Sequence, residues 1–317
     1  MTDTELRARL AMLSPDRRSE LLDRLRTRRA ADPGARPSAR VPAGRSPDRP
    51  ADLVMPLLSG SGGHAPVFFV HESSGSPLAY GALCRELPDG IPCQGISVPG
   101  LDRGALPRTV AEMAEAYADA VCEVSPEGPY RLVGWSVGGV LAHATAVRLR
   151  ERGREVALLA LLDTQGPAVL EEEPDAALLR AMFAENVALT AGQQPPAGSV
   201  AELAALDETA QADRVMDALK AAGLVPTGSA SLLKRRMEVF RTIVATAAVW
   251  RPERYDGQID LVLAETSDAS VVDAWRTWTS GPVVRHDVPG DHYAMMRPPQ
   301  VAESARTLGT LLLGRTK

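Results

Sequence analysis

Seven consecutive apolar residues, Val156–Leu162, constrain the fold more than any other segment of the chain. The run has the length of a strand and is far shorter than the roughly 20 apolar residues that a membrane-spanning helix needs. A strand without alternating polar residues is typical of a parallel sheet that is covered on both faces. The segment therefore predicts an α/β protein in which helices flank a mostly parallel central sheet.

Strand-like and helix-like segments alternate along residues 53–162, as such a sheet requires. Short apolar segments predict strands at Leu53–Leu58, Pro66–His71, Gln94–Val98 and Tyr130–Val133, and helical patterns occupy Ser76–Glu86, Val110–Val124 and Gly138–Arg152. A glycine-rich turn, Ser59–His64, lies between the first two predicted strands. The alternation supports the α/β class.

The alternation stops after Asp163. Helical periodicity alone is visible at about 175–190, 200–222 and 229–250, and strands return at Gln258–Ala264 and Pro282–Val288, each followed by a loop or a helix. A helical block inserted between two strands of a sheet is typical of a lid. We therefore predict a lid at about 168–250.

The first 50 residues are predicted to lie outside the α/β body, which would occupy residues 51–317. Apolar residues at helical spacing predict a helical appendage at 1–31, and the Pro- and Arg-rich segment 32–50 predicts a linker. Residues 1–50 hold 12 Arg against seven Asp and Glu, so they carry +5, whereas the rest of the chain carries −10.

Composition argues against several function classes. A net charge of −5 gives no basis for expecting nucleic-acid binding. No apolar run is long enough for a membrane span, and charged residues instead of a signal-peptide core follow Met1, so we expect a cytoplasmic protein. The three cysteines lack metal-ligand spacing and are expected to be reduced thiols.

The motif Gly134-Trp135-Ser136-Val137-Gly138 lies between a predicted strand and a predicted helix. In this setting small residues flank the serine because the chain turns too tightly for larger side chains. The turn holds the Ser136 hydroxyl clear of the sheet, and the start of the helix places the Val137 N–H where an oxyanion can accept from it. We predict that Ser136 is a nucleophile and that Val137 forms part of an oxyanion hole.

A serine nucleophile needs a histidine that takes its proton, and the chain has five histidines. We predict that His292 is this base, because it follows the last predicted strand and satisfies the chain order Ser, Asp, His. His71 ends a strand and could instead shape the oxyanion loop. The histidines in a helix, a turn and a strand are expected to be structural: His143, His64 and His286.

The third member of the triad is a carboxylate that orients the imidazole, and we assign it to Asp163. This residue directly follows the buried strand, at the end of the sheet where such sites form. An acid after seven apolar residues is costly unless it has a partner. The alternatives are an Asp163 that caps a helix before Gly166-Pro167, or Asp291 as the orienting acid, although adjacent residues rarely point at each other.

A metal site is the weaker interpretation of the residues near the C-terminus. His286, Asp287, Asp291 and His292 could be imagined as ligands, but a triad accounts better for His292. We therefore expect no metal and no cofactor of the chain's own.

With these residues assembled, residues 51–315 resemble the thioesterase domains of nonribosomal peptide and polyketide synthases, a branch of the α/β-hydrolase superfamily. The resemblance rests on the helical insertion and on five sequence features: Pro66–His71, Gly75, Gly134–Gly139, Leu161–Asp163 and Gly290–Met296. It implies the α/β-hydrolase fold, the triad Ser136, Asp163 and His292, and oxyanion amides at Val137 and Ser73.

Two local features refine the resemblance. Trp135 before the serine and the glycine pair after it are more similar to chain-terminating domains of peptide synthetases than to editing thioesterases. Family members often carry His-Pro-Ala-Gly-Gly in the early loop, whereas this chain has His-Glu-Ser-Ser-Gly at 71–75. The departure puts the second oxyanion donor in doubt and places a carboxylate, Glu72, near the entrance of the site.

The resemblance implies a thioesterase that releases a peptidyl or polyketidyl chain from the phosphopantetheine arm of a carrier protein through an acyl-Ser136 intermediate, by hydrolysis or macrocyclisation, in secondary-metabolite (antibiotic) biosynthesis. The implied partner is an acyl or peptidyl carrier protein or an upstream synthetase module. An editing (type II) thioesterase and a general carboxylesterase use the same triad. A non-catalytic carrier-binding module is the remaining alternative, which an intact triad disfavours.

The start of the chain also bears on the partner. The chain begins with Met1, and the segment Leu-Ser-Pro-Asp-Arg-Arg at 13–18 is similar to segments that link modules in such synthetases. These features predict a free-standing enzyme that meets its carrier protein in trans. Residues 1–31, which are basic against an acidic remainder, would be the recruiting arm.

Overall fold

The computed structural model describes residues 49–60, 63–167, 174–194, 200–224 and 230–314. The predicted appendage at 1–31 and nearly all of the predicted linker at 32–50 lie outside the described residues. The first described helix, the 3₁₀ helix η1, starts at Pro50, which is the last residue of the predicted linker.

A seven-stranded sheet forms the centre of the described fold. Its strands, in chain order, are β1 Val54–Leu58, β2 Val67–Val70, β3 Cys93–Ile96, β4 Tyr130–Trp135, β5 Val156–Leu162, β6 Ile259–Ala264 and β7 Val283–Val288. Their spatial order is β1-β3-β2-β4-β5-β6-β7, and β1 is antiparallel to β3 while the other neighbours are parallel. The predicted mostly parallel sheet is confirmed.

Helices connect these strands. They are η1 Pro50–Leu53, η2 Pro77–Tyr80, α3 Gly81–Glu86, α4 Val110–Val124, α5 Val137–Glu151, α6 Ala176–Thr190, α7 Val200–Ala204, α8 Glu208–Ala221, α9 Ala230–Ala248, α10 Ser270–Arg276, η3 Ala294–Met296 and α11 Val301–Gly314. The single helix expected at 200–222 is two, because the chain breaks after α7 and Asp207 caps α8 by accepting from the Ala210 N–H at 2.9 Å.

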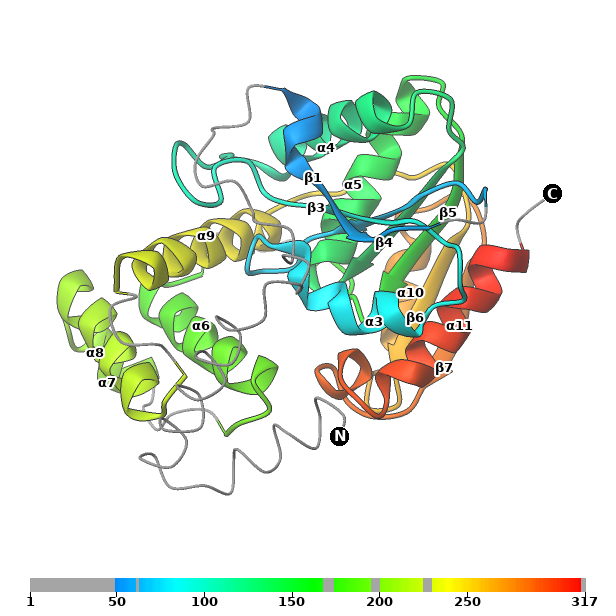
Figure 1. Cartoon of the computed structure of the whole chain (residues 1–317). Helices are drawn as coiled ribbons and strands as arrows, with labels where there is room; N and C mark the ends of the chain where they lie inside the picture. The colour runs from blue at the N-terminus through cyan, green and yellow to red at the C-terminus, as the bar shows by residue number, and fades with distance from the viewer. Residues whose placement is uncertain (1–48, 61–62, 168–173, 195–199, 225–229, 315–317) are drawn as a thin grey trace, which may run out of the picture. The chain divides into compact units, whose positions relative to one another are not determined.

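The alternation of side chains along β5 divides the core into two layers. Leu159 and Leu161 pack in one apolar cluster with residues of α4, α5 and α10, and Leu158 and Leu162 pack in another with residues of α3 and α11. Successive residues of a strand point to opposite faces, so a strand with apolar residues at every position is buried on both. Figure 1 shows α4 and α5 on one side of the sheet and α3 and α11 on the other.

The order of the strands fixes where a site can form. The chain crosses from β2 to β3 on one side and then back past β2 to β4 on the other, so the direction of winding reverses beside β2. Open α/β sheets bind ligands outside the carboxyl ends of the strands at such a switch point. The loop that follows β2 and the turn that follows β4 both begin there.

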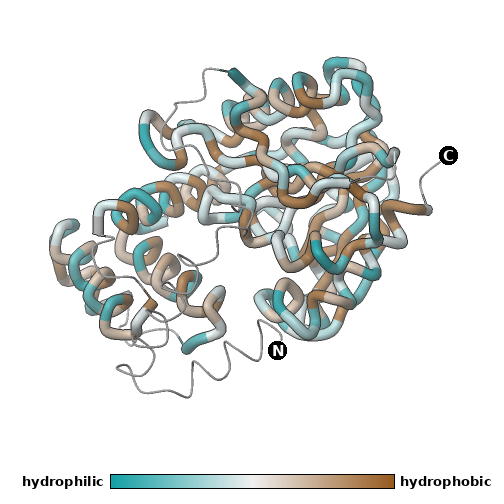
Figure 2. Tube along the Cα trace, viewed as in Figure 1, coloured by the Kyte–Doolittle hydropathy of each residue, from teal (hydrophilic) through white to brown (hydrophobic). Residues whose placement is uncertain are grey.

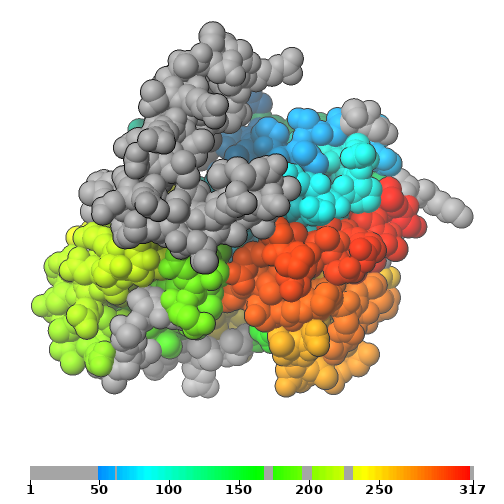
Figure 3. All heavy atoms as spheres, turned by 60° about the horizontal axis from the view of Figure 1, so that its bottom comes forward, coloured from blue at the N-terminus to red at the C-terminus, as the bar shows by residue number. Residues whose placement is uncertain are grey.

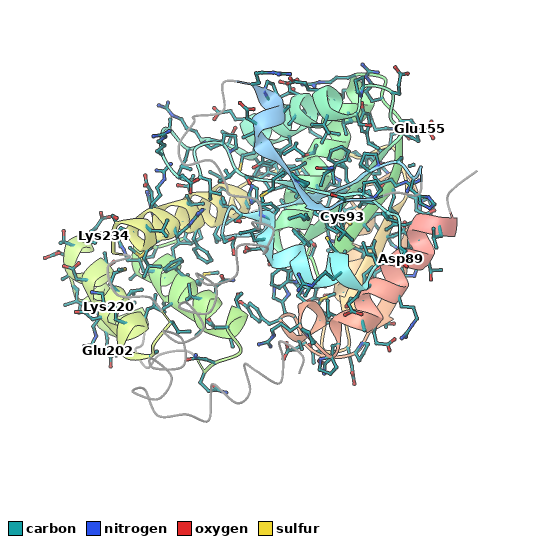
Figure 4. All side chains as sticks on the ribbon, viewed as in Figure 1. Asp89, Cys93, Glu155, Glu202, Lys220 and Lys234 are labelled. Carbon is teal, nitrogen blue, oxygen red and sulfur yellow. The ribbon has the colours of Figure 1, made fainter. Side chains whose placement is uncertain are left out.

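The helices α6–α9 occupy the interval in which we predicted a lid. Residues of these helices form an apolar cluster of their own, with Phe183 of α6, Leu219 of α8 and Phe240 of α9 among its members. Teal and brown alternate along α8 and α9 in Figure 2, as expected for helices with one buried face. Figure 4 shows Glu202, Lys220 and Lys234 on the outer side of these helices.

Helix α9 also belongs to the main core. Its residues Val239 and Ile243 pack in the same cluster as α4 and α5. Arg235 donates to the carbonyl oxygens of Gly100 and Gly104, and Arg236 pairs with Asp102 at 3.1 Å, so α9 is fixed to the loop that follows β3. The four helices are therefore not equivalent, because α9 is anchored more firmly than α6–α8.

Among the described residues, no helix is long and apolar enough to cross a membrane.

We predict that amide hydrogen exchange separates α9 from the helices that precede it. Amides of α6 and α8 should exchange at least about tenfold faster than those of α9 beyond residue 238, because no described residue of α6–α8 belongs to the two main apolar clusters. Exchange followed by mass spectrometry of peptides from each helix measures the difference, with β5 as the slow reference. Equal rates across all four helices would contradict the division.

Candidate active site

The turn around Ser136 connects the end of β4 to the start of α5. Ser136 has φ 57° and ψ −131°, outside the usual regions for a side-chain-bearing residue. A Cβ at Gly134 would collide with the Gly138 carbonyl oxygen, and one at Gly138 would lie 2.7 Å from the carbonyl oxygens of Val70 and His71. Glycines on both sides of the serine are therefore required for this turn to form.

Positive φ angles mark two non-glycine residues in the described part of the chain, Ser136 and Asp163. Such backbone is costly by about 1–3 kcal/mol per residue and persists where the surrounding structure imposes it. The two residues lie side by side in the sheet, since the Ser136 N–H donates to the Leu162 carbonyl at 3.0 Å. The strain is therefore concentrated at the ends of β4 and β5.

Asp163 and His292 are in direct contact. His292 Nδ1 lies 2.7 Å from Asp163 Oδ2, and the other carboxylate oxygen accepts from the Ser267 hydroxyl and from the Ala264 N–H at 3.1 Å. Burial alone would raise the pKa of Asp163, but the hydrogen bonds from His292 and Ser267 outweigh it and hold the pKa below the ordinary 3.8. The carboxylate is thus ionised at neutral pH and fixes Nδ1 as the protonated nitrogen, which leaves Nε2 free to accept a proton.

Asp291 does not face the imidazole of His292. Its Oδ1 atom accepts from the N–H groups of Tyr293 and Ala294, at 2.9 and 2.8 Å, in the turn that leads into the short helix η3. Of the two acids considered for orienting the histidine, the structure places Asp163 against it.

Two other histidines are buried, and burial lowers the pKa of each to about 4, so both are neutral. His71 donates from Nδ1 to the Glu72 carbonyl at 2.7 Å and accepts at Nε2 from the Tyr117 hydroxyl, which fixes the start of the loop after β2. His143 packs among the aromatic rings of Trp250, Tyr255 and Trp275. His286 lies 3.0 Å from the buried Asp260.

Trp135 connects the turn around Ser136, called the elbow from here on, to the loop that carries His292. The two rings stack at a centroid distance of 5.0 Å, and Trp135 Nε1 donates to the His292 carbonyl at 3.2 Å. The residue before the serine therefore positions the histidine. From the sequence, Trp135 was only a point of family resemblance, and this contact was missed because it joins residues 157 positions apart.

Tyr80 supports the elbow from η2. Its hydroxyl accepts from the Trp135 N–H at 2.7 Å and donates to the Val70 carbonyl at 2.6 Å. β2 ends at Val70, opposite Gly134, so the tyrosine continues the hydrogen-bond ladder for one more residue of β4. Burial raises the pKa of Tyr80, so the hydroxyl keeps the proton that it donates.

The loop after β2 brings Ser73 to the same end of the sheet. The Ser74 N–H donates to Glu72 Oε2 at 2.8 Å, and the Gly75 N–H donates to the Glu72 carbonyl at 3.0 Å. Within the described part of the chain, the Ser73 N–H donates to no protein acceptor. Val137 is the first residue of α5, so its N–H has no acceptor one helical turn earlier.

The helix α6 contacts the segment that follows His292. Arg297 Nη1 donates to the Leu189 carbonyl in the last turn of α6 at 3.0 Å, and Asn186 donates to the Tyr293 hydroxyl at 3.4 Å. Figure 3 shows α6, in green, beside the orange-red segment after β7. A change in the position of α6 would therefore act directly on the residues next to His292.

Among the residues that the structure describes, no three His, Cys, Asp or Glu side chains converge as metal ligands would. His286 pairs with Asp260 and Asp287 pairs with Arg285, so neither contacts His292.

The fold and these contacts are those of an α/β-hydrolase, with a strained serine after the central strand and an Asp–His pair beside it. The model of the thioesterase domain family matches residues 65–309, and the chain belongs to this family, a family of hydrolases.

The chain is similar to parts of peptide synthetases. It is 28% identical over 273 residues to CymA of Salinispora arenicola (strain CNS-205), a probable non-canonical nonribosomal peptide synthetase, and the match covers 84% of this chain and 3% of that protein. It is 27% identical to the crystal structure of holo-AB3403, a four-domain nonribosomal peptide synthetase bound to AMP and glycine, with a TM-score of 0.75 over 82% of this chain and 20% of that one. The chain thus spans a small part of each of these relatives.

The NocB thioesterase domain from the nocardicin cluster is matched along its whole length. Its crystal structure superimposes with a TM-score of 0.58 at 26% identity, covering 83% of this chain and 100% of that one.

We predict that Tyr80→Phe weakens both the fold and the site. The variant leaves the buried Trp135 N–H without an acceptor, which should lower the free energy of unfolding by about 1–3 kcal/mol. Urea unfolding measures this loss. Tyr130→Phe is the matched control, because the Tyr130 hydroxyl makes only long contacts of 3.4 and 3.5 Å away from the elbow. Equal losses in the two variants would contradict the role of Tyr80.

We predict that the stability contributed by Asp163 is lost in acid. The folded pKa lies below the ordinary 3.8, so the carboxylate stabilises the fold above that pH and loses this contribution as the pH falls through the folded value. Asp163→Asn should therefore cost about 2 kcal/mol at neutral pH and progressively less below about pH 4. Denaturant unfolding of both proteins across this range measures the difference. A cost that does not change with pH would show that the charge is not the stabilising feature.

Proposed function

We propose that the chain is a serine thioesterase that releases a peptidyl or polyketidyl chain from the phosphopantetheine arm of a carrier protein. The observation that carries the proposal is the 2.7 Å contact between His292 and Asp163 beside the strained serine of the elbow. Membership of the thioesterase domain family and similarity to parts of peptide synthetases support the substrate class. The partner is an acyl or peptidyl carrier protein or a synthetase module.

The first half of the reaction forms an acyl-enzyme. His292 Nε2 takes the proton of the Ser136 hydroxyl as Oγ attacks the thioester carbonyl carbon. The oxyanion accepts hydrogen bonds from the N–H groups of Val137 and Ser73. The carbon–sulfur bond then breaks, and the pantetheine thiol leaves with the proton that His292 had taken.

The second half releases the product. Water, or an amine or hydroxyl of the acyl chain, attacks the Ser136 ester while His292 takes its proton and returns it to Oγ. Asp163 keeps the imidazole in the required tautomer and stabilises its positive charge in both halves. The helices α6–α9 would limit the access of water, and an excluded water favours cyclisation over hydrolysis.

We predict that Ser136 is the covalent nucleophile. Incubation with a fluorophosphonate should add mass to the peptide that contains Ser136, and Ser136→Ala should lose labelling and at least about 10⁴-fold in kcat/KM for an acyl thioester. Ser280→Ala removes an exposed hydroxyl elsewhere and is the matched control. Full labelling of Ser136→Ala would contradict the assignment. A preference for oxygen esters over carrier-bound thioesters would favour a general carboxylesterase.

A further inference from the structure

Glu72 is a buried acid within the site. It is 5% exposed and lies between His71, which directly follows the strand β2, and Ser73, whose N–H we assign to the oxyanion hole. One carboxylate oxygen, Oε2, accepts from the Ser73 hydroxyl at 2.9 Å and from the Ser74 N–H at 2.8 Å. The Ser74 side chain also hydrogen-bonds the carboxylate, and among the described residues no hydrogen-bond donor to it comes from outside this loop.

The surroundings of Glu72 do not neutralise its charge. The ionisable groups that interact with it electrostatically are His292, Tyr293 and Tyr80, and no Arg or Lys of the described segments pairs with it. Burial raises the pKa of Glu72 above its ordinary value, and the hydrogen bonds of the loop and the interaction with His292 offset only part of this rise. An unpaired carboxylate at this depth is costly, and its charge opposes an oxyanion that forms one residue away.

We propose that Glu72 is a specificity-determining residue that binds a protonated amine on the acyl chain. The proposal rests on the proposed function and names its substrate class, an acyl chain with a free ammonium group close to the thioester carbonyl. An ammonium group offsets the repulsion between Glu72 and the oxyanion, and it supplies a charge-assisted donor to the carboxylate.

The position of the amine follows from the loop. The carbonyl oxygen of the substrate binds at the Ser73 N–H, and adjacent Cα atoms are about 3.8 Å apart. A group that contacts the Glu72 side chain is therefore only a few bonds from the carbonyl carbon. The free α-amine of an aminoacyl unit meets this requirement, whereas an amine at the far end of a long acyl chain does not.

The loop itself does not need the charge. A glutamine at position 72 keeps an oxygen that can accept from both Ser73 and Ser74, so Glu72→Gln preserves the loop and removes only the negative charge. This isosteric change separates recognition of an amine from support of the loop.

The test compares two thioesters of N-acetylcysteamine that differ only in the amine, leucyl and isocaproyl. The wild-type chain should turn over the leucyl thioester with a kcat/KM roughly tenfold to a hundredfold higher, which is the size of one charge-assisted hydrogen bond. Glu72→Gln should abolish this preference without lowering the activity on the isocaproyl thioester, because the glutamine removes the charge that opposes the oxyanion. Glu72→Asp keeps the charge but moves it back by one methylene group, so it should give an intermediate preference.

The matched control is Glu185→Gln. Glu185 is an exposed acid of α6 that interacts electrostatically with Tyr293, as Glu72 does, and its loss should leave the preference unchanged. The proposal is overturned if Glu72→Gln keeps the leucyl preference or lowers both activities equally. Turnover of neither thioester by the wild-type chain would instead overturn the proposed thioesterase activity, and the assignment of Glu72 with it.

Discussion

Asp163 joins three parts of the site: the end of β5, the loop after β6 and His292 after β7. It continues β5, its backbone N–H extends the ladder to β6 by donating to Val262, and its side chain accepts from the loop after β6 and from His292 after β7. An acid at the end of a strand buried on both faces is stable only when such donors surround it. The same donors that stabilise the carboxylate thereby bring the histidine to the end of the sheet.

The strained backbone at Ser136 has a comparable set of supports. The Ser136 N–H donates to the Leu162 carbonyl, Tyr80 accepts from the preceding residue, and Trp135 stacks on His292. The partners in these contacts come from three other parts of the chain, so the turn is held by the assembled fold and not by its own residues. A backbone conformation of this kind is retained because the packing around it leaves no relaxed alternative.

The helices between β5 and β6 differ in how they attach to the core. α9 is part of the layer that covers the sheet, whereas α6 contacts the segment after His292 through hydrogen bonds with Arg297 and Tyr293. A ligand that displaces α6 would therefore also move the segment that follows His292. Glu72 occupies the loop after β2, a different segment, so under the proposed function recognition of the acyl chain and its access would depend on separate parts of the chain.

Local pattern in the amino-acid sequence was enough to predict most of the elements and to propose the chemistry of the site. Periodicity identified the parallel sheet, and the position of Ser136, Asp163 and His292 after predicted strands was enough to propose a triad, because parallel strands bring their carboxyl ends to one edge. Periodicity also located the helical insertion, although it merged α7 and α8 into one helix and did not distinguish loop from helix after β6 and β7.

The groups that support the site could be identified only in the folded chain. Tyr80 contacts Trp135 across 55 residues and Ser267 contacts Asp163 across 104, and no periodicity or motif spans such separations. The contact of His292 with Asp163 and not with Asp291 is likewise visible only in the folded chain, where the Asp291 side chain accepts from the N–H groups of Tyr293 and Ala294. Glu72 was recognisable in the sequence as an acid near the entrance of the site, but its burial beside His292 depends on how the loop after β2 folds against the elbow, through contacts between distant segments.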